Sequence, residues 1–228
     1  MKKLMTLAIA ALMLLWSGAA LGSYLNPVGV TIDSIYSHTE ADYWTFADFT
    51  SPNTSTNSEF SLLVEKAGYE SGFGIYTVDD IANPTAIGTK FTIFDPTDEP
   101  LMDKTVNVKI DAGKYYVTLG PKNDPATVWT LFDKSFGFFF DVKNTSQSYY
   151  TDMQFNTVDK QLEHVSTFYA DGYAKAMVFL DDQTGGGDRD FNDMVVKVTD
   201  VVPVPEPTTL LLLGGGLVGV GFLRRRRS

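Results

Sequence analysis

Apolar side chains in the middle of this chain alternate with other residues at a period of two. One such run contains Phe136, Phe138 and Phe140, and another contains Val106 and Val108. A period of two places successive side chains on opposite faces of a strand, whereas a helix repeats every 3.6 residues. The alternation therefore predicts strands that turn one face toward a core, and it argues against a helical fold.

Turn-forming pairs such as Asn83-Pro84, Asp95-Pro96 and Gly120-Pro121 separate the β-rich runs. We expect strands at 60–64, 73–77, 91–94, 106–110, 115–119, 136–142, 164–169, 174–180 and 194–198, with one short helical turn at 78–81. Many short strands joined by turns are typical of all-β proteins. The sequence thus predicts an all-β fold, an antiparallel, jelly-roll-like β-sandwich, over residues 23–200.

The first 22 residues have the layout of a secretory signal peptide. Lys2 and Lys3 form a short cationic start, an apolar run follows at 4–16, and small residues occupy most of 17–23. Small residues of this kind fit the cleavage pocket of a signal peptidase. We expect cleavage after Ala20 or Gly22 and export of the remaining chain.

The C-terminal end combines a proline-containing linker, a short apolar segment and a basic tail. The linker is expected at 201–207 and holds Pro205, Glu206 and Pro207; the membrane segment is expected at 208–223, and the tail at 224–228. The apolar run 210–223 would span about 21 Å as a helix, short of the ~30 Å hydrocarbon core, so the crossing is marginal. The tail carries Arg224, Arg225, Arg226 and Arg227, which should stay cytoplasmic and leave the preceding domain outside.

This order of features resembles the PEP-CTERM sorting signal over residues 204–228. The resemblance implies recognition by an exosortase, a membrane transpeptidase that cuts near the motif and transfers the protein to a surface carrier. It also implies a Gram-negative bacterium that makes extracellular polysaccharide, a possible partner. We expect a protein that is anchored in the cytoplasmic membrane at first and then reaches the cell surface or the extracellular matrix. A permanent anchor is the alternative, and it too places the domain outside.

The charge and the cysteine count exclude several classes of function. Between the terminal basic residues, 12 lysines and arginines face 28 acidic residues, a net charge of about −16. Such a surface repels nucleic acid, so we expect no DNA or RNA partner. The chain has no cysteine, which excludes disulfides, thiol nucleophiles and cysteine-bound zinc.

The densest polar cluster lies at 181–193, between two predicted strands. The candidate metal ligands are Asp182, Asp188, Asp190, Asn192 and Asp193. Oxygen ligands at alternate positions on a turning backbone suit Ca²⁺, which takes six to eight of them. The start of the cluster is like an EF-hand loop, but Asp193 and Thr199 occupy the positions that need glycine and glutamate, so an EF-hand is excluded. The alternative is an acidic hairpin loop whose carboxylates cap turns and pair with Arg189.

The tract 187–196 also resembles the bacterial extracellular family called domain of unknown function 4114. The tract reads Gly-Asp-Arg-Asp-Phe-Asn-Asp-Met-Val-Val, and the aromatic run 136–140 and the tract 149–156 fit the preceding strands of that family. The resemblance is best over 70–200. It implies an all-β extracellular module without established enzymatic activity. The pair Asp181-Asp182 departs from the family pattern, which leaves Asp181 the less certain ligand.

No catalytic constellation stands out, so we expect a non-catalytic protein. His38 is expected on the surface, and His164 is expected as a surface residue at the start of a strand rather than as a base. No Gly-x-Ser-x-Gly elbow is present. One alternative is a carbohydrate-binding module in which Tyr43, Trp44 or Trp129 stacks on sugars. Another is a glycoside hydrolase with paired carboxylates.

Overall fold

The computed structural model describes residues 36–39, 41–47, 55–65, 70–121, 128–170, 172–183 and 191–205. The predicted signal peptide, the membrane segment 208–223 and the basic tail lie outside these residues. Within them, no helix is long and apolar enough to cross a membrane. The described part of the chain is built almost wholly from antiparallel strands, as the alternating pattern predicts.

The larger sheet has eight strands in the order β1-β11-β12-β13-β3-β6-β7-β8. Their bounds are β1 Ser37–Thr39, β3 Ser55–Glu65, β6 Asp103–Asp111, β7 Lys114–Leu119, β8 Thr130–Phe132, β11 Val165–Ala170, β12 Lys175–Leu180 and β13 Met194–Thr199. Two of its hairpins, β6–β7 and β11–β12, join strands that follow each other in the chain. Such local pairing explains why the alternating pattern is easy to read in this sheet.

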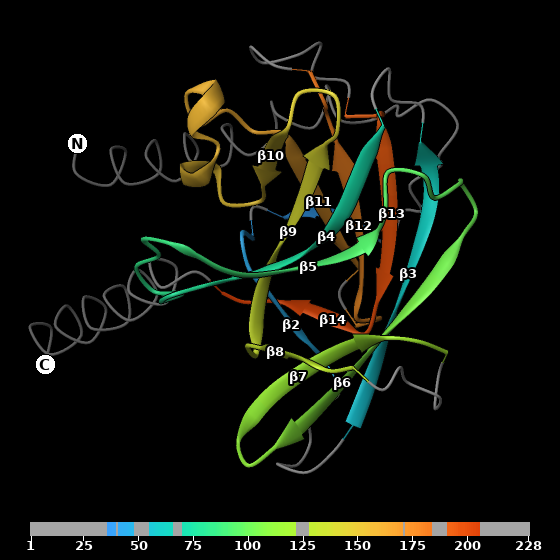
Figure 1. The fold of residues 1–228 in the computed structure, drawn as a ribbon, viewed down its shortest axis with the longest axis vertical. Coiled ribbons are helices and arrows are strands. Elements are labelled where there is room, and N and C mark those ends of the chain that lie inside the picture. The colour runs from blue at the N-terminus through green and yellow to red at the C-terminus, as the bar shows by residue number, and fades with distance from the viewer. Residues whose placement is uncertain are drawn as a thin grey trace, which may run out of the picture.

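The smaller sheet has the order β14-β2-β9-β4-β5, and β10 pairs with β9 beside this path. Its strands are β2 Trp44–Phe46, β4 Ser71–Val78, β5 Ile87–Phe94, β9 Ser135–Val142, β10 Gln147–Tyr150 and β14 Val201–Pro203. Two short 3-10 turns, η1 Met153–Phe155 and η2 Thr157–Asp159, follow β10. In Figure 1, β4, β5 and β9 lie in front of β12 and β13, which gives the two layers of a sandwich.

The main core fills the space between the two sheets. Phe60 and Val178 come from the larger sheet, Trp44, Phe73 and Phe138 come from the smaller one, and all five belong to one buried cluster. The rings of Phe60 and Phe73 meet across the two sheets at 6.3 Å between centroids. Because the chain has no disulfide, this inter-layer packing is the principal source of stability that the described residues provide.

A second aromatic cluster, formed by Tyr43, Tyr76, Phe139 and Tyr150, lies apart from the main core. Glycine makes room for two of these rings. A Cβ atom on Gly137 would lie 2.4 Å from the Tyr76 ring, and one on Gly74 would lie 2.7 Å from the Phe139 ring. The cluster therefore depends on backbone positions without side chains.

All nine predicted strands are present, with small differences at their ends. The sequence missed β1, β2, β8, β10 and β14, which have only three or four residues each. The helical turn expected at 78–81 is instead the end of β4 and the start of a bend. The linker does not begin at residue 201, because 201–203 form β14 and pair with β2. The jelly-roll-like connectivity stays a prediction.

Replacing Gly137 by alanine should destabilise the domain by about 1 to 3 kcal/mol, the usual range for overpacking. The new Cβ would overlap the Tyr76 ring, which is fully buried and cannot swing away. Urea unfolding measures the loss. Gly72→Ala is the matched control, since its Cβ would lie 3.2 Å from the nearest atom. Equal losses in the two variants would contradict the packing described for Tyr76.

Candidate functional site

Two acidic residues lie buried where β12 leaves the larger sheet. Asp181 is fully buried and Asp182 is 3% exposed. Two backbone hydrogen bonds hold the end of β12. Asp181 N–H donates to His164 O at 3.0 Å, just before β11, and Asp193 N–H, just before β13, donates to Leu180 O at 3.2 Å. Carboxylates are rarely buried to this degree unless a charge or several donors compensate them. The end of β12 is therefore the candidate site.

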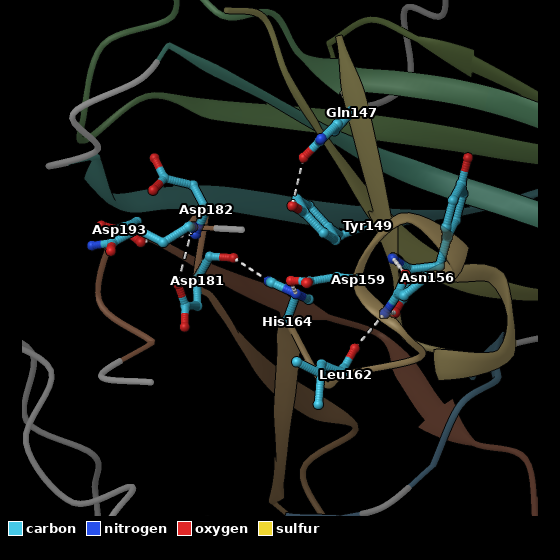
Figure 2. A network of polar contacts seen from close by, with 11 residues as sticks. Gln147, Tyr149, Asn156, Asp159, Leu162, His164, Asp181, Asp182 and Asp193 are labelled. Atoms are coloured by element: carbon cyan, nitrogen blue, oxygen red, sulfur yellow. Dashed lines mark hydrogen bonds and ion pairs between the residues drawn. The ribbon is translucent and has the colours of Figure 1, made fainter. Parts of the chain in front are cut away.

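The structure brings Asp182 and Asp193 together across the ends of β12 and β13. The backbone N–H of Asp182 donates to Asp193 Oδ2 at 2.8 Å, and Gln183 N–H donates to Asp181 Oδ1 at 3.1 Å. Phe191 has a left-handed backbone with φ of 50° and is buried beside Val195. These contacts close the base of the Asp-rich loop, and Figure 2 shows Asp181, Asp182 and Asp193 side by side there.

His164 lies beneath this base and is fully buried. Its Nδ1 lies 3.0 Å from the backbone oxygen of Asp181, and its Nε2 lies 2.8 Å from Asp159 Oδ2. The carbonyl oxygen of Asp181 can only accept, so Nδ1 carries the proton in that contact, and Nε2 shares a hydrogen bond with the Asp159 carboxyl group. The ring thus bridges Asp159 and the backbone of Asp181 inside the protein.

Tyr149 covers one face of His164. The two rings stack at 3.9 Å between centroids, and the Tyr149 hydroxyl donates to Gln147 Oε1 at 2.7 Å. Burial raises the pKa of Tyr149 to about 12, and the negative charges of Asp159, Asp181 and Asp182 add to the effect. The raised pKa thus reflects mainly the burial of the Tyr149 ring.

Asn156 holds the segment that carries Asp159. Its side-chain amide donates to the backbone oxygens of Tyr150 and Leu162, at 3.2 and 3.0 Å, and its Oδ1 accepts from Tyr150 N–H at 2.8 Å. The two 3-10 turns on either side of Asn156 are thereby fixed to β10. Figure 2 shows the result, a continuous polar network from Asn156 through His164 to Asp182.

The predicted ligand set stays a prediction. Asp182 N–H donates to Asp193 Oδ2, Asn192 follows Phe191 in the same segment and is partly buried, and Asp188 and Asp190 fall outside the described residues. Among the residues that the structure describes, no group of three or more acidic, histidine or cysteine side chains is placed to hold a metal ion.

Several expectations about single residues are wrong. His164 is not on the surface, because its partners come from η2, β10 and the end of β12, and no local pattern reveals them. His38 is partly buried and contacts Phe168 edge to face. Tyr43 and Trp44 are core residues, at 8% and 0% exposed, so they form no sugar platform.

The alkaline stability of the domain should depend on Tyr149. Its pKa is raised from an ordinary value of 10.0 to about 12, so its contribution is fully present below pH 10 and is lost as the pH rises toward 12. The wild type should therefore lose stability relative to Tyr149→Phe across this interval. Urea unfolding of both proteins at pH 8, 10 and 11 measures the difference. A difference that stays constant with pH would contradict the buried environment of Tyr149.

The comparisons with known proteins bear on the end of the chain. Residues 203–227 match the PEP-CTERM protein-sorting motif. No curated protein and no solved structure matches the chain, and the resemblance to domain of unknown function 4114 is not confirmed. Of the sorting motif, Pro205 is described and exposed, whereas Glu206 and Pro207 lie outside the described residues. The motif indicates an exported protein that an exosortase processes at the membrane and that is destined for the surface.

Proposed function

We propose that the protein is a non-catalytic β-sandwich of the cell surface or extracellular matrix whose Asp-rich loop binds one structural Ca²⁺. The observation that carries this proposal is the pair of buried acidic residues, Asp181 and Asp182, next to Asp193. In this reading Asp182, Asp188, Asp190, Asn192 and Asp193 supply the oxygen ligands. The sorting motif supports the destination, and the sequence, with no cysteine and no Gly-x-Ser-x-Gly elbow, offers no evident nucleophile for catalysis.

The balance of charge at the loop supports a cation. His164 is already engaged by Asp159 and by the backbone of Asp181, and it lies on the side of the network away from Asp193. The loop that follows Asp182 adds Asp188 and Asp190, with Arg189 as its single basic residue. Clustered carboxylates repel one another unless a cation or many N–H donors compensate them. Ca²⁺ fits this donor set better than Mg²⁺, which prefers a rigid octahedron with several waters.

Calcium should raise the melting temperature of the exported domain. Extracellular calcium modules bind with dissociation constants of about 0.1 to 1 mM. At 10 mM Ca²⁺ such a site stabilises the fold by roughly 1.4 to 2.7 kcal/mol. For a domain of this size, this corresponds to a rise of roughly 3 to 10 °C. Scanning calorimetry with Ca²⁺, with Mg²⁺ and with EDTA measures the shift.

The matched variants for this test are Asp182→Asn and Asp133→Asn. Asp182 lies at the loop base, while Asp133 is an exposed acidic residue between β8 and β9. We expect the calcium-dependent shift to disappear in Asp182→Asn and to persist in Asp133→Asn. A wild type that melts at the same temperature in millimolar Ca²⁺ and in EDTA would rule out the calcium site. A full shift in Asp182→Asn would place the ion elsewhere.

A second candidate function is binding of extracellular polysaccharide by the end of the larger sheet. Lys109, Tyr116 and Leu131 are direct neighbours across β6, β7 and β8. Trp129 is partly exposed beside them, with Lys109 Nζ 4.4 Å from the centre of its ring. Partly exposed aromatic rings next to a cation offer stacking and hydrogen bonds to sugars. This surface replaces the platform that we expected from Tyr43 and Trp44.

Affinity electrophoresis in gels that contain the producer's own polysaccharide tests the second candidate. The polysaccharide should slow the migration of the wild type relative to a plain gel. For Trp129→Ala, this slowing should be at least twofold smaller. Tyr173→Phe serves as the control, since Tyr173 is exposed on the distant β11–β12 hairpin. Equal mobility of wild type and Trp129→Ala in the polysaccharide gel would remove this surface from consideration.

A further inference from the structure

The last strand of the domain runs directly into the sorting motif. β14 pairs with β2 in the register Val201↔Phe46, Val202↔Thr45 and Pro203↔Trp44. The backbone N–H of Val204 continues this ladder and donates to Tyr43 O at 2.8 Å. Pro205, the first residue of the motif, follows at once. The folded domain and the motif are therefore contiguous in the chain.

β14 is held on its other side as well. Val201 is fully buried in the main core, and its N–H donates to Ala174 O at 3.1 Å in the β11–β12 hairpin. At the same end, Ala47 N–H, next to β2, donates to Asp200 O at 2.8 Å. The strand is thus fixed to β2, to the core and to a hairpin of the larger sheet.

An enzyme that cuts a peptide bond binds the flanking residues in an extended form, and main-chain hydrogen bonds supply much of that binding. In the folded domain, the main chain just before Pro205 is paired with β2, and the N–H groups of Val201 and Val204 are already bonded to Ala174 O and Tyr43 O. This pairing opposes cleavage while β14 is in place.

We propose that β14 is a latch on sorting: the exosortase processes the motif only when β14 and Val204 detach from β2. The inference rests on the sorting role of residues 203–227 and adds a conformational step to it. A short terminal strand suits such a step, because local opening at chain ends costs far less than global unfolding. Asp200 supports separate opening, since its left-handed φ of 58° makes a one-residue corner between β13 and β14.

A disulfide between positions 45 and 202 would keep β14 attached to β2. Thr45 and Val202 are direct partners in a hydrogen-bonded pair, where Cα atoms lie about 5.5 Å apart, a separation that disulfides favour. The chain has no other cysteine, so Thr45→Cys with Val202→Cys gives a single defined bridge. The full-length protein is expressed in an exosortase-bearing host, and loss of the C-terminal segment is followed by electrophoresis of membrane fractions. We expect the oxidised variant to be processed at least tenfold more slowly than wild type, and dithiothreitol to restore the rate.

Two controls separate the possible outcomes. Each single cysteine variant should be processed at the wild-type rate. A flexible insert of about six glycine and serine residues between Val204 and Pro205 should restore processing of the oxidised double variant. Wild-type rates in the oxidised double variant would overturn the latch, and so would failure of the insert to restore processing. A wild type that keeps its C-terminal segment in this host would instead contradict the sorting role itself.

Discussion

The contact on which the candidate site depends is the buried hydrogen bond between His164 and Asp159. It joins η2 to the start of β11, and the second ring nitrogen extends it to the backbone of Asp181 at the end of β12. Tyr149 adds β10 of the smaller sheet through ring stacking. One imidazole thus connects both layers of the sandwich at the end where the Asp-rich loop leaves. Removing one partner leaves a buried polar group without its hydrogen bond, so this contact tolerates little change.

In the described residues, apolar packing and the polar network occupy different regions of the domain. Inter-layer packing of aromatic and aliphatic side chains forms the main core, and glycines such as Gly137 let a second aromatic cluster lie close to the backbone. The polar network occupies one end, next to the proposed calcium loop. The C-terminal strand runs directly into the sorting motif. The base of the acidic loop and the strand that precedes the sorting motif are therefore different elements of the described domain.

The sequence predicted the long strands because runs of β-branched and aromatic residues stand out between turn-forming residues, and some of these runs alternate with a period of two. It missed β2 and β14 because three residues are too few to show a pattern. It also misjudged His164, whose burial is decided by Tyr149, Asp159 and Asp181, residues that the chain brings together only on folding. The predicted ligand set stays a prediction, since Asp188 and Asp190 lie outside the described residues. Local sequence patterns reveal secondary-structure elements, whereas buried polar networks depend on contacts between residues that are far apart in the sequence.

A double-mutant cycle on Asp159 and His164 tests the central claim most directly, that their buried pair holds the base of the loop. The free energies of unfolding are measured for the wild type, Asp159→Asn, His164→Gln and the double variant. Each single change should cost about 1 to 3 kcal/mol, and the double change should cost clearly less than their sum, because the second removal leaves no buried group without its hydrogen-bond partner. Additive losses would contradict the account and would show that the two residues act independently.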